Sequence, residues 1–344
     1  MVENDIIYKC EDGREQKLKI KSNTLDLNKI YIPFARITYI NIAKTTITHI
    51  ADNFIMPMLT HIELPDTIEY IGEAFLINNK ALMKLDISNT KIKKINHYFL
   101  RNCELLNEIK LPRSITEIAG DGFLENCNML ERIDLTQMPN LTRIGSDFLS
   151  NCKNLEEVLI PNTVYNIGSS FLYGNKKLKK IDISHLKNAE KIGHSFLGGC
   201  TSLIEVKLPN NVKTIDGLFL RDCTKIKNVD ISNLTKLKII EYDFLLGCKS
   251  IEKIKLPKTI EHISTSFLNG CVKIKAIDLS NIPIKTINDS FLNFTNIIDV
   301  ILPPTLIHLG ECDWGTKNNI NITSYNYLYN IKIDTDNTDT DNTD

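Results

Sequence analysis

The sequence lacks an excess of charge of either sign and has no long apolar run. Its 41 Lys and Arg residues balance 42 Asp and Glu residues, whereas nucleic-acid-binding domains usually carry a basic patch. No stretch of about 18 apolar residues could form a membrane-spanning helix, and the acidic residues 1–5 do not open a secretory signal. We therefore expect a soluble intracellular protein that neither binds nucleic acid nor inserts into a membrane.

Sequence motifs of catalysis and of metal binding are also missing. The chain has no P-loop, GxGxxG, HExxH or GxSxG motif. Its seven histidines are scattered without partners at metal-ligand spacing. The Asp/Thr/Asn-rich tail lacks the glycine and the closing glutamate of an EF-hand loop. We expect a protein that is not an enzyme and that holds no cofactor or metal.

Phenylalanine is the residue whose positions are most informative. Eleven of the 13 Phe residues recur at intervals of roughly 21–25 residues, and nearly all of them are followed by Leu. Self-similarity at such a period is typical of a stacked solenoid, which offers one extended surface. The recurring residues are Phe54, Phe75, Phe99, Phe123, Phe148, Phe171, Phe196, Phe219, Phe244, Phe267 and Phe291.

Each repeat begins with a leucine-rich strand motif, L-x-x-I-x-L, whose apolar positions are expected to point inward. Two kinds of repeat alternate along the chain. One ends its strand in proline, as at Pro112 and Pro161, and the other carries Asp followed two positions later by Ser or Thr, as at Asp134 and Asp182. Proline has no N–H to donate and is expected to end the hydrogen-bonded run. The alternation indicates a two-repeat unit copied about five times.

Cysteine occupies a fixed position four residues after the recurring Phe. Asn79, Asn175 and Thr295 fill the same position in other repeats, so we interpret it as a slot for a small buried residue. Stacked turns would bring cysteines within disulfide reach, but an intracellular chain meets a reducing compartment and should keep them as thiols. The seven residues are Cys103, Cys127, Cys152, Cys200, Cys223, Cys248 and Cys271.

The segment from Ile109-Lys110-Leu111-Pro112 to Phe123-Leu124 and Cys127 resembles the BspA-type (Treponema pallidum-type) leucine-rich repeat family. The resemblance covers residues 37–312. It implies an α/β leucine-rich-repeat solenoid, or horseshoe, with a parallel concave β-sheet of about 12 repeats of 23–25 residues and short helical or irregular convex segments. Family members on cell surfaces are associated with adhesion. Similar repeats occur in protists and in giant viruses of amoebae, whose Asn/Ile/Lys-rich composition this chain shares.

The two ends of the chain depart from the repeat. Asp12-Gly13 lies between two alternating apolar runs, which predicts a β-hairpin within residues 1–36 that caps the first turn. Trp314 and Tyr325 predict an aromatic C-terminal cap over residues 313–331. Residues 332–344 are low in complexity and are expected to be disordered.

The outward strand positions carry their own pattern of charge. Between Lys84 and Lys207 acidic and basic residues alternate along and across the strands, except at Leu159. Opposite charges on neighbouring strands contribute about 0.2–1 kcal/mol per pair, so one interpretation is a face whose charges neutralise each other. The positions that break this alternation suggest a second interpretation, that a partner binds there. Neutral drift of the repeat is the alternative explanation of these positions. The candidate partner-binding residues are Asn228, Lys253, Lys255, Ala276, Asp299, Ile301 and Leu159.

The sequence therefore predicts a monomeric, non-enzymatic scaffold that binds an unknown protein partner through its concave face, in the host cytoplasm if the protein is viral. One alternative is an adhesin-like protein on a cell or virion surface. Another is a substrate adaptor of a ubiquitin ligase, because the hairpin around Asp12-Gly13 resembles the opening hairpin of Skp1/BTB proteins.

Overall fold

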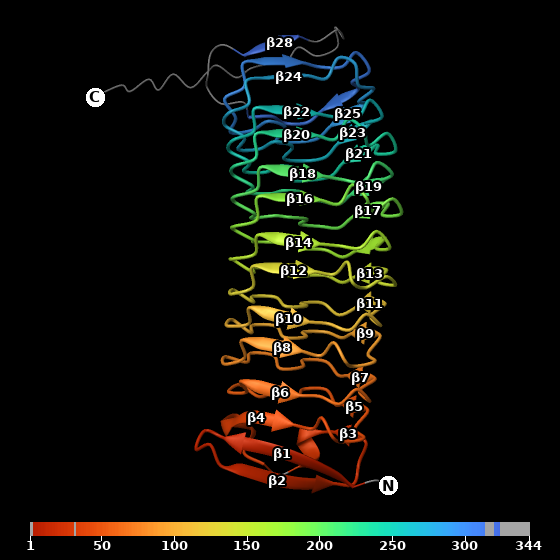
Figure 1. Cartoon of the computed structure of the whole chain (residues 1–344). Coiled ribbons are helices and arrows are strands. Elements are labelled where there is room, and N and C mark those ends of the chain that lie inside the picture. Colours follow the sequence, from red (N-terminus) through yellow and green to blue (C-terminus); the bar gives the residue numbers. More distant parts are fainter. Residues whose placement is uncertain (1–2, 31, 314–319, 324–344) are drawn as a thin grey trace, which may run out of the picture.

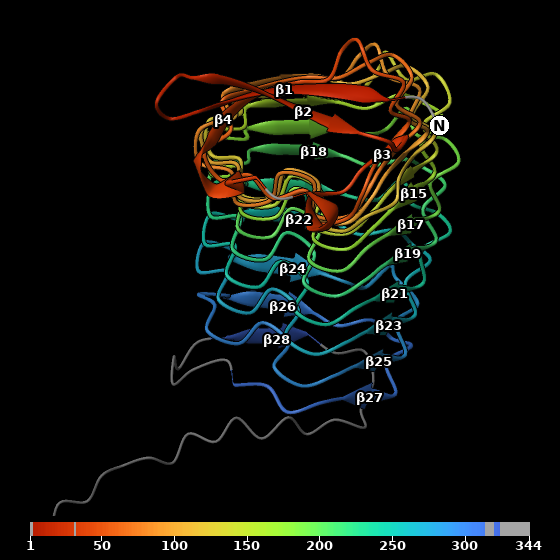
Figure 2. The same ribbon diagram turned by 90° about the horizontal axis from the view of Figure 1, so that it is seen from below.

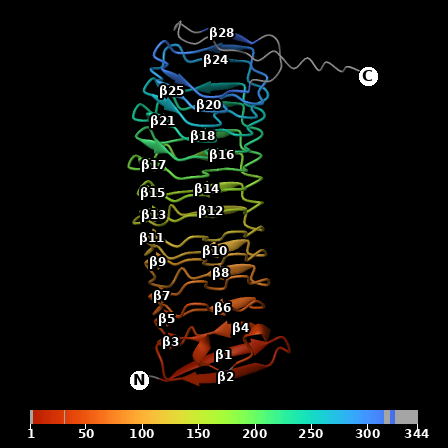
Figure 3. The same cartoon turned by 180° about the vertical axis from the view of Figure 1, so that it is seen from behind.

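The computed structural model describes residues 3–30, 32–313 and 320–323. The chain winds into a stack of similar turns that rises as a column from the N-terminal hairpin (Figures 1 and 3). Strands of successive turns run parallel to each other. The predicted solenoid with a parallel sheet is confirmed.

One side of the column is built by the L-x-x-I-x-L segments. Their strands occupy every second place in the chain order (Figure 1), and we call the surface formed by their outward side chains the strand face. The strands are β4 (Ile37–Asn41), β6 (His61–Glu63), β8 (Lys84–Asp86), β10 (Glu108–Lys110), β12 (Arg132–Asp134), β14 (Glu157–Leu159), β16 (Lys180–Asp182), β18 (Glu205–Lys207), β20 (Asn228–Asp230), β22 (Lys253–Lys255), β24 (Ala276–Asp278), β26 (Asp299–Ile301) and β28 (Asn321–Thr323).

A second side carries a ladder of two-residue strands, which the I-x-x-I segments supply. In Figure 2, which views the stack from below, this ladder lies beside the strand face at an angle to it. Its members are β3 (Thr24–Leu25), β5 (His49–Ile50), β7 (Tyr70–Ile71), β9 (Lys94–Ile95), β11 (Glu117–Ile118), β13 (Arg143–Ile144), β15 (Asn166–Ile167), β17 (Lys191–Ile192), β19 (Thr214–Ile215), β21 (Ile239–Ile240), β23 (His262–Ile263), β25 (Thr286–Ile287) and β27 (His308–Leu309).

The remaining side consists of tight turns that contain the Phe-Leu pairs. The sequence left open whether this side holds short helices or irregular segments, and the structure shows irregular turns. The Leu after each recurring Phe, from Leu76 to Leu292, has a left-handed backbone with φ between 52° and 61°, a conformation that costs an L-residue roughly 1–2 kcal/mol. Within the described residues the helices are two short 3₁₀ turns before β4, η1 (Leu27–Lys29) and η2 (Phe34–Arg36).

The recurring phenylalanines form a continuous spine inside the column. Each ring is at most 1% exposed and stacks on the ring of the next turn. Ring centroids lie between 4.9 Å, for Phe219 and Phe244, and 6.1 Å, for Phe99 and Phe123. Burying a Phe side chain contributes about 1.5–3 kcal/mol, so the spine ties every turn to its two neighbours.

The position four residues after Phe supplies a hydrogen-bond donor as well as a small volume. The thiol of Cys127 donates to the carbonyl of Leu100, the left-handed leucine of the preceding turn, at 3.3 Å. The other six cysteines repeat this contact, and in the same slot the amide of Asn175 donates to Leu149 O at 3.0 Å. All seven thiols are free and buried, so the slot satisfies a backbone carbonyl that the left-handed turn directs inward.

The predicted hairpin is present. Strand β1 (Asn4–Cys10) pairs antiparallel with β2 (Glu15–Ile20) and, on its other edge, antiparallel with β4. It therefore covers the first open edge of the parallel stack. The predicted C-terminal cap lies mostly, and the predicted disordered tail entirely, outside the described residues, and the boundaries at residues 36 and 312 stay predictions.

The strand face is divided into pairs of turns. Its hydrogen-bonded groups are β4–β6, β8–β10, β12–β14, β16–β18, β20–β22 and β24–β26–β28. From β6 to β22, each interruption follows a strand that ends in proline. At two interruptions a side chain of the next turn bridges to the carbonyl before the proline: Asn89 Nδ2 donates to Leu64 O at 3.1 Å, and His185 Nε2 donates to Ile160 O at 2.8 Å. The two-repeat unit of the sequence is thus a physical unit of the sheet.

Candidate functional site

Charges on the strand face pair within these two-turn units. Lys84 Nζ lies 2.7 Å from Glu108, and Lys110 Nζ lies 3.5 Å from Asp86. The same arrangement recurs between β16 and β18. Across the interruptions no ion pair of this face joins two strands in the part of the chain that the structure describes. The alternating charges were expected to meet opposite charges on both sides; the pairing is one-sided because the strands separate after each proline-type turn.

Lys253 is the exception on this face. Its register partner on β20 is Asn228, which carries no charge, and the next strand offers Ala276 in the same column. Every other lysine or arginine in the two outward columns forms an ion pair. Among the described residues, the exposed ammonium of Lys253 has no carboxylate within ion-pair distance. A charge that the fold leaves unpaired is available to a partner.

The remaining predicted residues around Lys253 lie on consecutive strands. Lys255 is paired, since its Nζ lies 2.9 Å from Asp230 Oδ2. Ala276 faces Asp299 across β24 and β26, and Asp299 accepts a hydrogen bond from Asn321 at 2.9 Å. Ile301 is half-buried beside Asp278. We call these six residues the Lys253 patch: Asn228, Lys253, Lys255, Ala276, Asp299 and Ile301.

The seventh predicted residue, Leu159, lies apart from the patch. It ends β14, whereas the patch occupies β20 to β26. Leu159 lines a cleft at the interruption between β14 and β16, together with Asp182 and His185 of the following turn. Sequence reasoning named Leu159 but missed the cleft and the residues from the next turn, because nothing in one strand indicates where neighbouring strands separate.

The repeated aspartates of the strand face are bound by their own turns. Asp182 Oδ1 accepts hydrogen bonds from the Ser184 amide at 3.0 Å and from its hydroxyl at 2.6 Å. The Ser184 hydroxyl is the main cause that lowers the pKa of Asp182, and Lys207 lowers it further. Thr136 acts in the same way on Asp134. These carboxylates are therefore ionised at neutral pH and serve as turn caps rather than as acids or bases.

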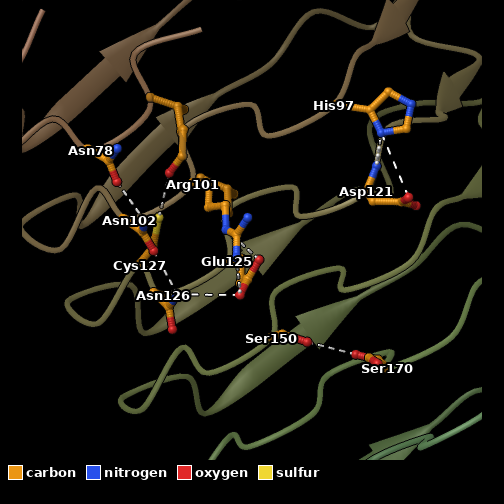
Figure 4. A network of polar contacts seen from close by, with 12 residues as sticks. Asn78, His97, Arg101, Asn102, Asp121, Glu125, Asn126, Cys127, Ser150 and Ser170 are labelled. Carbon is orange, nitrogen blue, oxygen red and sulfur yellow. Dashed lines mark hydrogen bonds and ion pairs between the residues drawn. The ribbon is translucent and has the colours of Figure 1, made fainter. Parts of the chain in front are cut away.

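A network of polar side chains along the turn edge is shown in Figure 4. Asn102 donates to Asn78 and Asn126 donates to Asn102, each at 2.7 Å. Arg101 Nε lies 2.8 Å from Glu125, and burial raises the pKa of this carboxyl. Each contact links one turn to the next, so the network stabilises the stack and does not converge on a reaction centre.

The described residues contain no group of three or more His, Cys, Asp or Glu placed to hold a metal ion. Burial raises the pKa of the Cys103 and Cys152 thiols to about 12, which leaves them protonated and unreactive. In the same part of the chain, no helix has the length and hydropathy that crossing a bilayer requires.

Known proteins and protein families match this chain along its repeats. The model of the BspA type leucine rich repeat region matches in six copies, over residues 28–138, 120–243 and 222–336. A leucine-rich repeat protein from Bacteroides ovatus shares the fold, with a TM-score of 0.59 and 20% identity over 90% of each chain. The T. pallidum leucine rich repeat protein gives a TM-score of 0.40 and 16% identity, covering 73% of this chain and 86% of its own. No curated protein matches the chain.

Proposed function

The chain belongs to the BspA-type leucine-rich repeat family, and from this premise we propose that it is a non-enzymatic scaffold that binds another protein through its strand face. Repeat solenoids commonly use such extended surfaces for binding. The family and fold support a role in interaction or at a surface. The intracellular location, the monomeric state and the protist or giant-virus source belong to the same proposal.

The observation that carries the proposal is the unpaired charge of Lys253. Elsewhere the strand face satisfies its own cations through contacts such as Lys84–Glu108 and Lys180–Glu205. Beside Lys253, which stands where the sister strands carry Glu, the expected cations are replaced by Asn228 and Ala276. A partner that brings a carboxylate to Lys253 gains an ion pair without breaking one inside the scaffold, and such complementarity speeds association and gives specificity.

The adaptor alternative assigns partner docking to the N-terminal hairpin. There β1 is occupied on both edges, by β2 and by β4. On β2, Lys17 lies 2.6 Å from Asp5 and Lys19 lies 3.1 Å from Glu3. The charges of this hairpin pair with each other, so its contacts favour a capping role over a docking role.

Affinity capture from a lysate of the source cells tests the proposal, with bound proteins identified by mass spectrometry. Lys253→Glu is compared with Lys153→Glu, which makes the same charge change at an exposed turn position outside the strand face. A third variant, Lys17→Ala/Lys19→Ala, alters the hairpin surface. The proposal expects a partner that Lys253→Glu loses and the other two variants retain. A partner lost only with the hairpin variant would contradict it and favour the adaptor alternative.

A further inference from the structure

The strand face has a cleft between β14 and β16, of about 540 Å³. Apolar side chains of Leu159, Pro139 and Pro161 line it, and Asp182, His185 and Asn162 supply its polar groups. No cation is among its lining residues.

The same interruption one unit earlier, between β10 and β12, provides an internal comparison. Its cleft is smaller, about 380 Å³, and is lined by Lys110 and Arg113 together with Asp134 and Gln137. Lys110 takes the place in its repeat that Leu159 takes in the next unit, and Arg113 corresponds to Asn162. The β14–β16 cleft has therefore lost both of the cations of its counterpart and has kept the carboxylate.

Lysine at this position has a defined role in the sister strands. Lys110, Lys207 and Lys255 each reach back to the aspartate of the preceding strand, at 3.5, 3.5 and 2.9 Å. Asp134 stands opposite Leu159 in the register and receives no such lysine. Its nearest cation is Arg132 of its own strand, at 3.7 Å, and Arg132 Nε also lies 3.0 Å from Glu157.

A carboxylate beside Leu159 lacks the lysine that pairs with its counterparts. The His185 ring lines the cleft, and its Nε2 donates to the Ile160 carbonyl at 2.8 Å. Asp182 Oδ2 already lies 3.5 Å from Lys207 Nζ, whereas Asp134, whose Oδ1 is held by Thr136, has only the shared Arg132 near its Oδ2. An ammonium group offers three donors and no acceptor, and a lysine stem covers apolar surface.

We propose that the cleft over Leu159 binds a lysine side chain of a protein partner, whose ammonium takes the place that Lys110, Lys207 and Lys255 fill within the chain. The stem lies over Leu159 and Pro161, and the ammonium lies beside Asp134, the strand-face aspartate that stands opposite Leu159. This inference rests on the proposed function, because it specifies the partner's chemistry, and it adds a second contact region, apart from the Lys253 patch.

Methyl NMR titration of the full chain tests this inference without an identified partner. The probe is N-acetyl-lysine methylamide, and N-acetyl-norleucine methylamide is the matched control that keeps the stem and lacks the ammonium. We expect the lysine probe to shift the methyl resonances of Leu159 saturably while those of Leu111, in the sister cleft, stay in place. The norleucine probe should bind about tenfold more weakly, since hydrogen bonds to charged groups contribute roughly 1.5–3 kcal/mol.

Two variants separate binding from folding. Leu159→Lys restores the residue type of three sister strands, so the fold should persist while the Ile160 and Val158 methyls no longer respond to the probe. Asp134→Asn keeps the shape of the side chain and should weaken binding about tenfold. Equal shifts in both clefts, equal binding of the norleucine probe, or full binding by Leu159→Lys would overturn the inference. If the lysine probe fails to bind the cleft but Lys253→Glu still loses the captured partner, this inference is wrong and the proposed function stands.

Discussion

The hydroxyl of Tyr242 lies 3.2 Å from Nδ1 of His194, although the two residues belong to turns that are separated by a whole intervening turn. Their ring centroids are 5.8 Å apart. Gly217 occupies the intervening turn, and a Cβ atom there would lie 2.6 Å from the Tyr242 ring. The missing side chain at Gly217 therefore creates the path by which Tyr242 reaches His194, a contact between turns that are not neighbours.

Gly217→Ala is expected to displace the Tyr242 ring, which is 43% exposed and free to rotate outward. The cost should be about 1 kcal/mol, because one hydrogen bond to a partly exposed group is lost. The ring protons of His194 should shift in NMR spectra as the ring current of Tyr242 is removed. Tyr242→Phe, which keeps the ring, is the control, and an unchanged His194 spectrum in Gly217→Ala would contradict this account.

The Phe spine predicts a large difference between two identical substitutions. Phe148 is fully buried, with neighbouring ring centroids at 5.5 Å on both sides, and Phe148→Ala should lower the free energy of unfolding by about 3–5 kcal/mol. Phe294 is 68% exposed, so Phe294→Ala should change it by less than about 0.5 kcal/mol. Urea unfolding measures both values, and similar losses would show that the spine does not carry the stability of the stack.

Phe294 also has a left-handed backbone, with φ of 53°, at a place where Gly247 and Gly270 stand in the two preceding turns. Phe294→Gly should therefore raise the free energy of unfolding by about 1 kcal/mol, as backbone strain is removed. Thermal and urea unfolding of the wild type and of this variant check the sign. A loss of stability would show that the exposed ring makes a contact which outweighs the strain.

The sequence alone predicted the features that depend on residues within a single repeat. The position of Phe148 in its repeat predicts a buried ring, and Asp12-Gly13 predicts the hairpin, because local side-chain chemistry determines both. The left-handed backbone of Leu100 and the bond it accepts from Cys127 were not predicted, since leucine does not favour that conformation. The cleft at Leu159 depends on the spacing between two strands, and the contact of Tyr242 depends on a glycine in another turn.

The cysteine slot predicts thiols that resist modification until the protein unfolds. A pKa of about 12 leaves Cys103 and Cys152 almost entirely protonated at pH 8. Cys312 is half-buried and its pKa is raised to about 11, so it should react first with iodoacetamide, and the seven thiols of the slot should react at the rate of unfolding. Mass spectrometry of partly modified protein measures the order. Rapid modification of Cys127 in the folded state would contradict the buried donor role.

The turn-capping aspartates predict a dependence of stability on pH. The Ser232 hydroxyl, followed by Lys255, holds the pKa of Asp230 below its ordinary value of 3.8. A carboxyl whose pKa is lower in the folded state stabilises the protein above its unfolded pKa, and this contribution is lost as the pH falls through the folded value. Asp230→Ala should therefore reduce stability at pH 7, and the difference from the wild type should shrink below about pH 4.

Comparison with Asp278 separates the two causes of the lowered pKa of Asp230, which are the serine hydroxyl and the lysine. The pKa of Asp278 is lowered by Ser280, and no cation among the residues that the structure describes contributes to the shift. High salt screens exposed ion pairs, so 1 M salt should reduce the effect of Asp230→Ala and leave that of Asp278→Ala nearly unchanged. Equal salt sensitivity of the two variants would indicate that Lys255 does not contribute.

The most direct test of a partner-binding strand face is site-specific photo-crosslinking. A benzoylphenylalanine at position 276 replaces Ala276, an exposed residue next to Lys253 in the same outward column, and the same group at Tyr165 reports from the side of the second ladder. After irradiation in a lysate of the source cells, the account predicts a discrete crosslinked protein from position 276 that Lys253→Glu abolishes. A crosslinked protein from position 165 and none from position 276 would contradict it.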